Sequence, residues 1–347
     1  MKSKLLPLAA LLALPFGALA QTNVTVYGFI DAGVAMERGA AAGSVTKQAT
    51  SISGPSRLGF KGVEDLGGGT KAIFNIETGF NVDTGATATP NLFGRTTFVG
   101  LTGGFGTVTL GNQFTSLYTT LLLVGDPMRN GYAGQAGNLM NAAAVAGPRA
   151  VGGLGIFRAN TIKYKTPKIN GFDADVAYSF GEVAGDGSKS RSYGLSAGYA
   201  NGPLVVQASY LNTNNALGTD SSRNSLLAAN YNFGVAQAHF AYGVNKGFAS
   251  VDNTDLLVGV TVPFGTSRII ASYIHKNDKA ATANDANQIG LTYAYQLSKR
   301  TELYASAARI SQNAANTSAN FLSITNGAPG VPGGGDKSFN VGVSHYF

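Results

Sequence analysis

Hydrophobic and polar residues alternate with a period of two along much of this chain. Between Ile289 and Leu297 the odd positions are large and apolar or aromatic, whereas the even positions are small or polar. The same alternation appears in residues 175–180, in residues 204–210 and at the carboxyl end, in residues 339–347. Because successive side chains of a strand point to opposite faces, this pattern predicts β-strands with one apolar face. A soluble β-sandwich also alternates, so periodicity alone leaves two architectures open.

The lengths of the connections distinguish these two architectures. We expect sixteen strands, which begin near Val24, Ser56, Thr70, Gly94, Phe105, Phe157, Gly171, Arg191, Pro203, Asn224, Gly234, Thr254, Ser267, Asn287, Thr301 and Ser338. Each connection from an even-numbered strand to the next strand is a tight turn. The connections from odd-numbered to even-numbered strands are long. The clearest of these long connections cover residues 36–55, 80–93, 113–156, 212–223 and 312–337. Such alternation predicts a transmembrane antiparallel β-barrel with short periplasmic turns and long extracellular loops.

The amino terminus predicts export from the cytoplasm. Lys2 and Lys4 precede an apolar stretch that contains two prolines, and Ala18-Leu19-Ala20 is a small-residue cleavage site. The apolar stretch is shorter than the roughly 20 residues that a transmembrane helix requires. We therefore interpret residues 1–20 as a signal peptide cleaved after Ala20, and residues 21–347 as the β-barrel domain.

Composition and charge narrow the class of protein further. The chain has no cysteine, which excludes disulfides, thiolate nucleophiles and cysteine-ligated metals. Charged residues make up 12% of the chain, about half the usual share of a soluble domain. The formal net charge is +7, which becomes +5 when two lysines leave with the signal peptide (7 − 2). The basic residues are scattered rather than clustered on one element, and the chain is exported, so we expect no nucleic-acid partner.

Several ordered segments carry a resemblance to a known family. They are VTVYGFIDAGV from Val24, SRLGFKGVEDLGGGTKAIFNIETGF from Ser56, FGRTTFVGLTGGFGTVTLGNQF from Phe93, RANTIKYKTPKINGF from Arg158, NYNFGVAQ from Asn230, YQLSKRTELY from Tyr295 and the terminal FNVGVSHYF. Together they resemble the general trimeric porins of Gram-negative bacteria, especially those of Neisseria-like and Burkholderia-like organisms. The resemblance implies a sixteen-stranded barrel that assembles as a homotrimer, with a long third loop folded into each pore.

The third long connection, residues 113–156, is the longest in the chain. A structureless loop of this length in a compact domain is usually functional or disordered. Its apolar residues 117–124, followed by Gly125-Asp126-Pro127, predict a short helix on the barrel wall. The alternative is an extracellular flap.

A basic cluster at the pore constriction follows from the same resemblance. In the anion-selective members, arginines of the wall face the third loop, and alternation independently places Arg57 and Lys61 on one face of their strand. A cationic cluster in a narrow passage raises the local concentration of anions. The candidate constriction residues are Arg57, Lys61, Arg95, Asp126, Arg129 and Arg158. The alternative for each arginine is a solvated residue at the rim.

The resemblance also assigns a role to the terminal residue, Phe347. It implies that the barrel-assembly machinery recognises this carboxyl end as an insertion signal. The alternative is an aromatic side chain that only faces lipid at the membrane interface. The partners we expect are outer-membrane lipid and lipopolysaccharide, the barrel-assembly machinery, and small ions and solutes.

The sequence thus predicts an outer-membrane porin, a water-filled passive diffusion channel for small hydrophilic solutes and ions that prefers anions. A solute-specific channel remains an alternative, to which Tyr118 and Tyr132 could contribute, and so does a surface adhesin or antigen on the same barrel. We expect no enzyme and no cofactor or metal site. The three histidines, His239, His275 and His345, are widely spaced, and no set of nucleophile, base or paired carboxylates accompanies them.

Overall fold

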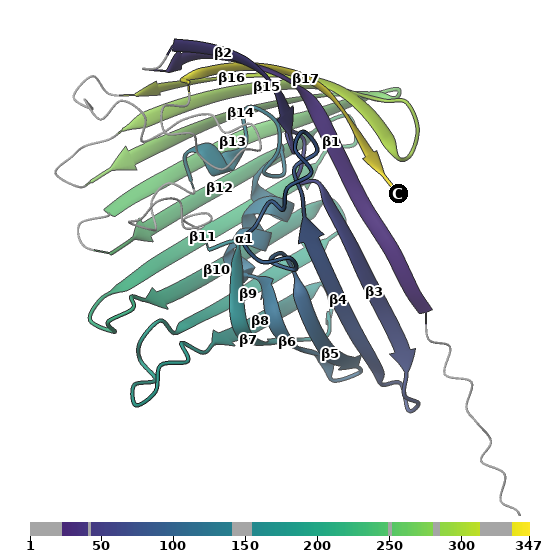
Figure 1. Ribbon diagram of the computed structural model, residues 1–347, viewed down its shortest axis with the longest axis vertical. Helices are drawn as coiled ribbons and strands as arrows, with labels where there is room; N and C mark the ends of the chain where they lie inside the picture. The colour runs from purple at the N-terminus through teal and green to yellow at the C-terminus, as the bar shows by residue number, and fades with distance from the viewer. Residues whose placement is uncertain (1–22, 41–42, 141–154, 249–251, 280–284, 313–334) are drawn as a thin grey trace, which may run out of the picture.

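The computed structural model describes residues 23–40, 43–140, 155–248, 252–279, 285–312 and 335–347. The expected signal peptide lies outside these ranges. Most of the described chain is β-strand (Figure 1). The strands are β1 (Asn23–Ala40), β2 (Gly43–Thr50), β3 (Arg57–Asp65), β4 (Lys71–Gly79), β5 (Thr97–Gly103), β6 (Gly106–Phe114), β7 (Phe157–Lys165), β8 (Phe172–Ser179), β9 (Ser192–Asn201), β10 (Leu204–Asn214), β11 (Ser221–Asn232), β12 (Gln237–Lys246), β13 (Asp252–Phe264), β14 (Ser267–Asp278), β15 (Ala286–Gln296), β16 (Thr301–Gln312) and β17 (Lys337–Tyr346).

The sheet closes on itself into a barrel. Every strand from β3 to β16 pairs antiparallel with the next strand in the chain. Strand β1 closes the ring, because it pairs with β17 along one edge (Val34 opposite Val341) and with β3 along the other (Tyr27 opposite Gly59). Every strand from β3 to β17 therefore has a partner on both sides, as a sheet in a membrane requires, whereas β2 pairs with β1 alone among the described strands. The expected antiparallel barrel is confirmed.

One expected loop is wrong. Residues 36–55 were predicted as a connection, but β1 continues to Ala40 and β2 pairs with its second half. Strands β2 and β3 lie one after the other along the same edge of β1, so together they form the second of sixteen barrel strands. Residues 51–56 interrupt this strand. Segment 43–50 lacks apolar alternation, and its strand structure depends on pairing with β1.

A buried carboxylate organises this interruption. Asp31 of β1 is fully buried, and its side chain accepts hydrogen bonds from the Ile52 amide, the Ser53 hydroxyl and, at 3.2 Å, the Tyr304 hydroxyl. The Ser56 hydroxyl in turn accepts a hydrogen bond from the Asp31 amide at 3.0 Å. These hydrogen bonds satisfy backbone groups that have no partner strand where residues 51–56 interrupt the pairing.

The apolar face of the strands points outward. Ile289 and Leu291 of β15 are 64% and 54% exposed, whereas Thr292 and Ala294, at the alternate positions that follow, are at most 1% exposed. Exposed apolar side chains recur on β17, where Phe339 is 45% exposed. This arrangement confirms the alternation that the sequence predicts and suits a barrel surrounded by lipid. Among the described residues, no helix is long and apolar enough to cross a membrane.

At one rim of the barrel every connection is short, and the longest is residues 166–171. The other rim has the long connections 80–96 and 115–156 together with several short ones. Gly202, in the turn between β9 and β10, has a φ of 54°, which favours glycine. At the opposite rim, the connection between β10 and β11 is shorter than expected, because these strands continue to Asn214 and from Ser221 and leave only residues 215–220 between them. Aromatic pairs lie near the short-turn rim, including Tyr231 and Phe233 with ring centroids 4.6 Å apart.

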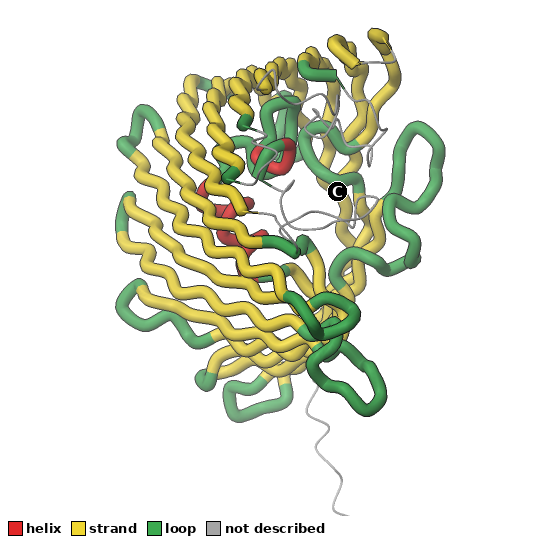
Figure 2. Tube along the Cα trace, turned by 90° about the vertical axis from the view of Figure 1, so that its left-hand side faces the viewer, coloured by secondary structure: helices red, strands yellow, loops and turns green. Residues whose placement is uncertain are grey.

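In the third long connection, loop 3 (residues 115–156), the described helical segments lie inside the barrel (Figure 2). Loop 3 contains α1 (Ser116–Thr120), the π-helical turn η1 (Leu121–Gly125) and the 3-10 turn η2 (Ala136–Asn138). The Thr115 hydroxyl caps α1 by accepting a hydrogen bond from the Tyr118 amide at 3.1 Å. Leu117, Leu121 and Val124 are buried in a cluster with wall residues of β10 to β13. The expected short helix on the barrel wall is confirmed, and residues 141–154 of the loop lie outside the described ranges.

Candidate pore constriction

Asp126 stabilises a tight turn in the middle of loop 3 through hydrogen bonds to three backbone amides. Its carboxylate accepts hydrogen bonds from the backbone amides of Met128 at 2.9 Å, Asn130 at 2.8 Å and Ala136 at 3.0 Å. The side chain is only 1% exposed. Burial raises the pKa of the Asp126 carboxyl above its ordinary value, and the three amides act in the opposite direction. Asp126 therefore shapes the loop more than it presents charge to the lumen.

Glycines let the loop approach the barrel wall closely. A Cβ added to Gly290 of β15 would lie 2.7 Å from Cα of Gly134, and a Cβ on Gly259 of β13 would lie 2.6 Å from Pro127. Beside this contact, the fully buried Gln288 donates to the carbonyl oxygen of Gly134 at 2.8 Å and accepts from Asn138 at 2.9 Å. The loop thus rests on the wall through direct backbone contact and buried hydrogen bonds.

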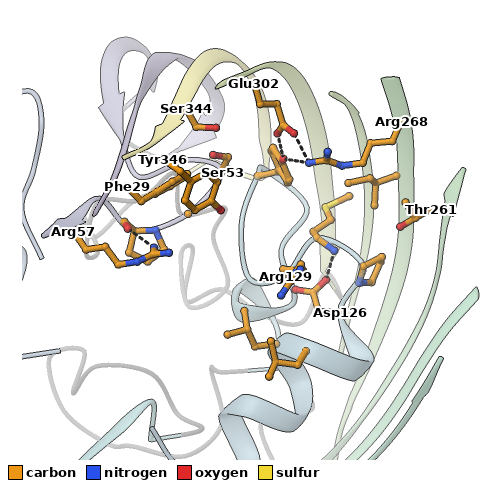
Figure 3. A pocket seen from close by; sticks show the side chains of 18 of the residues that line it. Phe29, Ser53, Arg57, Asp126, Arg129, Thr261, Arg268, Glu302, Ser344 and Tyr346 are labelled. Atoms are coloured by element: carbon orange, nitrogen blue, oxygen red, sulfur yellow. Dashed lines mark hydrogen bonds and ion pairs between the residues drawn. The ribbon is translucent and has the colours of Figure 1, made fainter. Parts of the chain in front are cut away.

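A second attachment joins loop 3 to the opposite end of the same wall. The Tyr132 hydroxyl donates to Glu302 of β16 at 2.5 Å and accepts from Arg268 of β14 at 3.1 Å. Arg268 and Glu302 themselves form an ion pair at 2.5 Å (Figure 3). Burial and the Glu302 carboxylate raise the pKa of the Tyr132 phenol, so it remains a proton donor at neutral pH.

Between loop 3 and the barrel wall lies a cavity of about 810 Å³ that reaches the short-turn rim. Figure 3 shows Arg57 beside Phe29 on one wall, Arg268 with Glu302 on another, and Arg129 on the loop between them. The charged residues that line the cavity are Arg57, Arg95, Arg129, Arg268, Lys299 and Arg300, against Glu77, Asp126 and Glu302. Six basic and three acidic groups give a formal charge of +3 (6 − 3).

Two of the expected arginines share one carboxylate. Glu77 of β4 pairs with Arg95 at 2.5 Å and lies 3.5 Å from Arg57. Aromatic rings support both guanidinium groups: Arg57 lies over Phe29 at 5.0 Å, and Arg95 lies over Phe157 at 5.5 Å. The structure therefore brings Arg57 and Arg95 together in the cavity, each partly neutralised.

The other expected residues are placed differently. Arg129 has a φ of 52°, is exposed in the cavity and forms no ion pair with any described residue. Lys61 lies over the Tyr27 ring at 5.1 Å, and Arg158 donates to the Thr213 hydroxyl at 3.0 Å. Neither Lys61 nor Arg158 lines this cavity. The six expected residues thus divide into four that border the cavity and two that do not.

Several lining residues were not among the expected set. They are Glu77, Arg268, Lys299, Arg300 and Glu302, together with Tyr27 and His239. The alternation along β14 could have predicted that Arg268 faces the interior. It lies two residues from Ile270, which is 2% exposed and faces inward, and residues two apart in a strand point to the same face. Nothing in the local sequence indicates that Arg268 meets Glu302 and Tyr132, since the latter contact joins positions 136 residues apart.

Comparisons with known proteins agree with this geometry. The profile of the Gram-negative porin family matches residues 8–315. Outer membrane porin protein 32 of Delftia acidovorans is 33% identical, and the alignment covers 100% of both chains. The solved anion-selective porin from Comamonas acidovorans is 31% identical, with a TM-score of 0.81 over 94% of this chain and 100% of that one. OmpT of Vibrio cholerae, solved in a trimer form, shares the fold at 17% identity, with a TM-score of 0.69 over 94% of this chain and 99% of that one. The chain belongs to the Gram-negative porin family and is an outer-membrane porin.

Proposed function

We propose that this porin is a passive, water-filled channel for small hydrophilic solutes and ions that prefers anions. The observation that carries the proposal is the charge of the cavity beside loop 3, where six basic groups face three acidic ones. Arg129, Lys299 and Arg300 have no ion-pair partner among the described residues, so their charges are not cancelled locally.

Electrostatics favours anions in such a passage. At physiological ionic strength, exposed charges act over about 8 Å, so the groups that line a narrow constriction dominate the field that a permeating ion meets. Low-dielectric walls focus this field and concentrate ions of the opposite sign. The related porin from Comamonas acidovorans is named anion-selective, which supports the same preference here.

The test is the reversal potential of the purified protein in a planar bilayer under a KCl gradient. We expect chloride preference in the wild type and a strong loss of it in the double variant Arg57→Ser/Arg95→Ser, because Glu77 then remains without its two partners. Arg158→Ser is the matched control, since Arg158 lies outside the cavity. An unchanged reversal potential in the double variant would overturn the role of Arg57 and Arg95, and cation preference in the wild type would overturn the proposed selectivity.

We also propose that the chain has no enzymatic activity. Each histidine has a hydrogen-bond partner typical of a structural role: the Val124 carbonyl for His239 at 3.2 Å, Asn287 for His275 at 2.8 Å and Thr301 for His345 at 2.9 Å. Turnover of an ester or peptide substrate by purified barrels would contradict this. No observation in the described residues favours the adhesin alternative over the channel.

For its assembly, we propose that the chain is exported with cleavage after Ala20 and forms a homotrimer within outer-membrane lipid and lipopolysaccharide. The outward apolar face of the strands supports contact with lipid or neighbouring barrels. The trimer form of the structurally similar OmpT supports the oligomeric state. The mass of the detergent-solubilised protein tests the proposal, and a monomer mass under mild conditions would contradict it.

A further inference from the structure

Two leucines of loop 3 contribute apolar surface to the cavity. Leu122 and Leu123 of η1 both line the cavity, and Leu123 is 55% exposed. The packing of loop 3 on the wall uses their neighbours Leu117, Leu121 and Val124, which are all at most 4% exposed. Leu122 and Leu123 are therefore not required to hold the helix in place. An apolar side chain exposed in a water-filled constriction offers its surface to whatever passes.

A continuous row of side chains connects the basic wall to these leucines. The guanidinium carbon of Arg95 lies 6.0 Å from the ring centroid of Phe114. Phe114 and Tyr118 stack with centroids 5.3 Å apart. Leu122 follows Tyr118 by four residues, which places it about one helical turn further along the same face. Arg95, Phe114, Tyr118 and Leu122 all line the same cavity, so apolar surface adjoins basic groups there.

We propose that this constriction is a weak binding site for amphipathic monocarboxylates, with the carboxylate at Arg57 and Arg95 and the apolar body along Phe114, Leu122 and Leu123. The proposal rests on the proposed anion preference and adds a substrate class to it. The cavity volume, about 810 Å³, lies within the range of roughly 300–1,000 Å³ of small-molecule sites, in which a few placed polar groups accompany apolar walls. Chloride and other inorganic anions use only the basic wall.

The expected effect follows from the number of methylene groups. Fully burying one methylene changes an affinity by roughly fourfold. Hexanoate has four methylenes more than acetate, and a groove open to the lumen covers only part of them, so we expect about tenfold tighter binding of hexanoate. Weak binding of this kind remains compatible with transport, because a solute must also leave the site.

The experiment measures how potassium acetate, butanoate and hexanoate block the chloride current of the reconstituted channel at neutral pH. In the wild type, the half-blocking concentration should fall with chain length, by about tenfold from acetate to hexanoate. In Leu122→Ser/Leu123→Ser, and in the milder Leu123→Ser, this dependence should flatten while the chloride preference stays. Leu217→Ser is the matched control, because Leu217 is 69% exposed in the connection between β10 and β11, away from the cavity.

Two results would overturn the inference. One is an equal half-blocking concentration of acetate and hexanoate in the wild type. The other is a chain-length dependence that persists in both leucine variants. The reversal potential separates these results from a failure of the proposed function: a channel without chloride preference contradicts the anion preference, whereas a chloride-selective channel that ignores chain length contradicts only the binding site.

Discussion

At the scale of single residues, Glu77 offsets part of the positive charge that lines the cavity beside loop 3. Its side chain is almost fully buried, pairs with Arg57 and Arg95, and accepts a hydrogen bond from the Tyr27 hydroxyl at 3.0 Å. One carboxylate therefore offsets part of the charge of two guanidinium groups.

We expect Glu77→Gln to increase the chloride preference. The substitution keeps the size of the side chain and raises the formal charge of the cavity lining from +3 to +4 (3 + 1). The ratio of chloride to potassium permeability should rise by roughly twofold, because a permeating ion meets the added net charge across the water of the lumen, which screens it. Reversal potentials under a KCl gradient provide the measurement. Glu64→Gln changes the net charge of the chain equally but lies outside the cavity, and equal shifts in both variants would contradict the assignment.

At the scale of elements, the described part of loop 3 packs against the inner wall of the barrel. The contact between Gly134 and Gly290 brings two backbones together at a distance that no larger residue permits. Asp126 holds the turn between Val124 and Asn130, and Tyr132 fixes the following segment to β14 and β16. The free cross-section beside the loop depends on these attachments.

Gly290→Ala should displace the loop towards the lumen. Its methyl group would lie 2.7 Å from Cα of Gly134 and 2.8 Å from Cε of Met128, so the loop must shift or the wall must yield. We expect a smaller single-channel conductance and a loss of stability of about 1–3 kcal/mol, as for other overpacked sites. The control is Gly243→Ala, where the nearest atom is 3.6 Å away. Conductance and melting temperature equal to those of the control would refute the expected displacement.

At the scale of the whole molecule, the last residue completes the barrel. The Phe347 amide donates to the Gly28 carbonyl at 3.2 Å, and the Gly28 amide donates to the Phe347 carbonyl at 3.1 Å. The Phe347 ring also occupies the space over Gly28, where a Cβ would lie 2.1 Å from it. The side chain remains 44% exposed, so it is accessible to a recognition partner.

Deletion of Phe347 should lower the yield of folded barrel in cells, because it removes two hydrogen bonds of the closing seam and the proposed insertion signal. Phe347→Ala keeps the backbone bonds, so a loss of yield in cells but not in refolding from detergent would identify recognition by the assembly machinery. Phe339→Ala is the control, since Phe339 is an equally exposed aromatic of the same strand. Wild-type yield after the deletion would contradict the role of Phe347. Heat-modifiable migration on gels distinguishes folded from unfolded chains.

The sequence by itself determined which side chains of each strand face outward and which face the interior of the barrel. A period of two decides which side chains face lipid, and this rule placed Ile289 outward and Arg57 inward without any knowledge of the fold. The lengths of the connections identified the barrel, and the apolar run in loop 3 indicated its helix. Each of these features is encoded locally, by neighbours in the chain.

The tertiary structure decided which of the inward-facing charges meet. Strand β2 exists because β1 provides an edge for it, and its own residues carry no apolar alternation. Tyr132 and Glu302 are 170 residues apart in the chain, so their contact depends on barrel closure and on where loop 3 folds. For the same reason Arg158, which faces a different part of the interior from Arg57 and Arg95, does not line the cavity beside them. Local periodicity fixes the face of a side chain, but only closure and the path of the loop fix its neighbours.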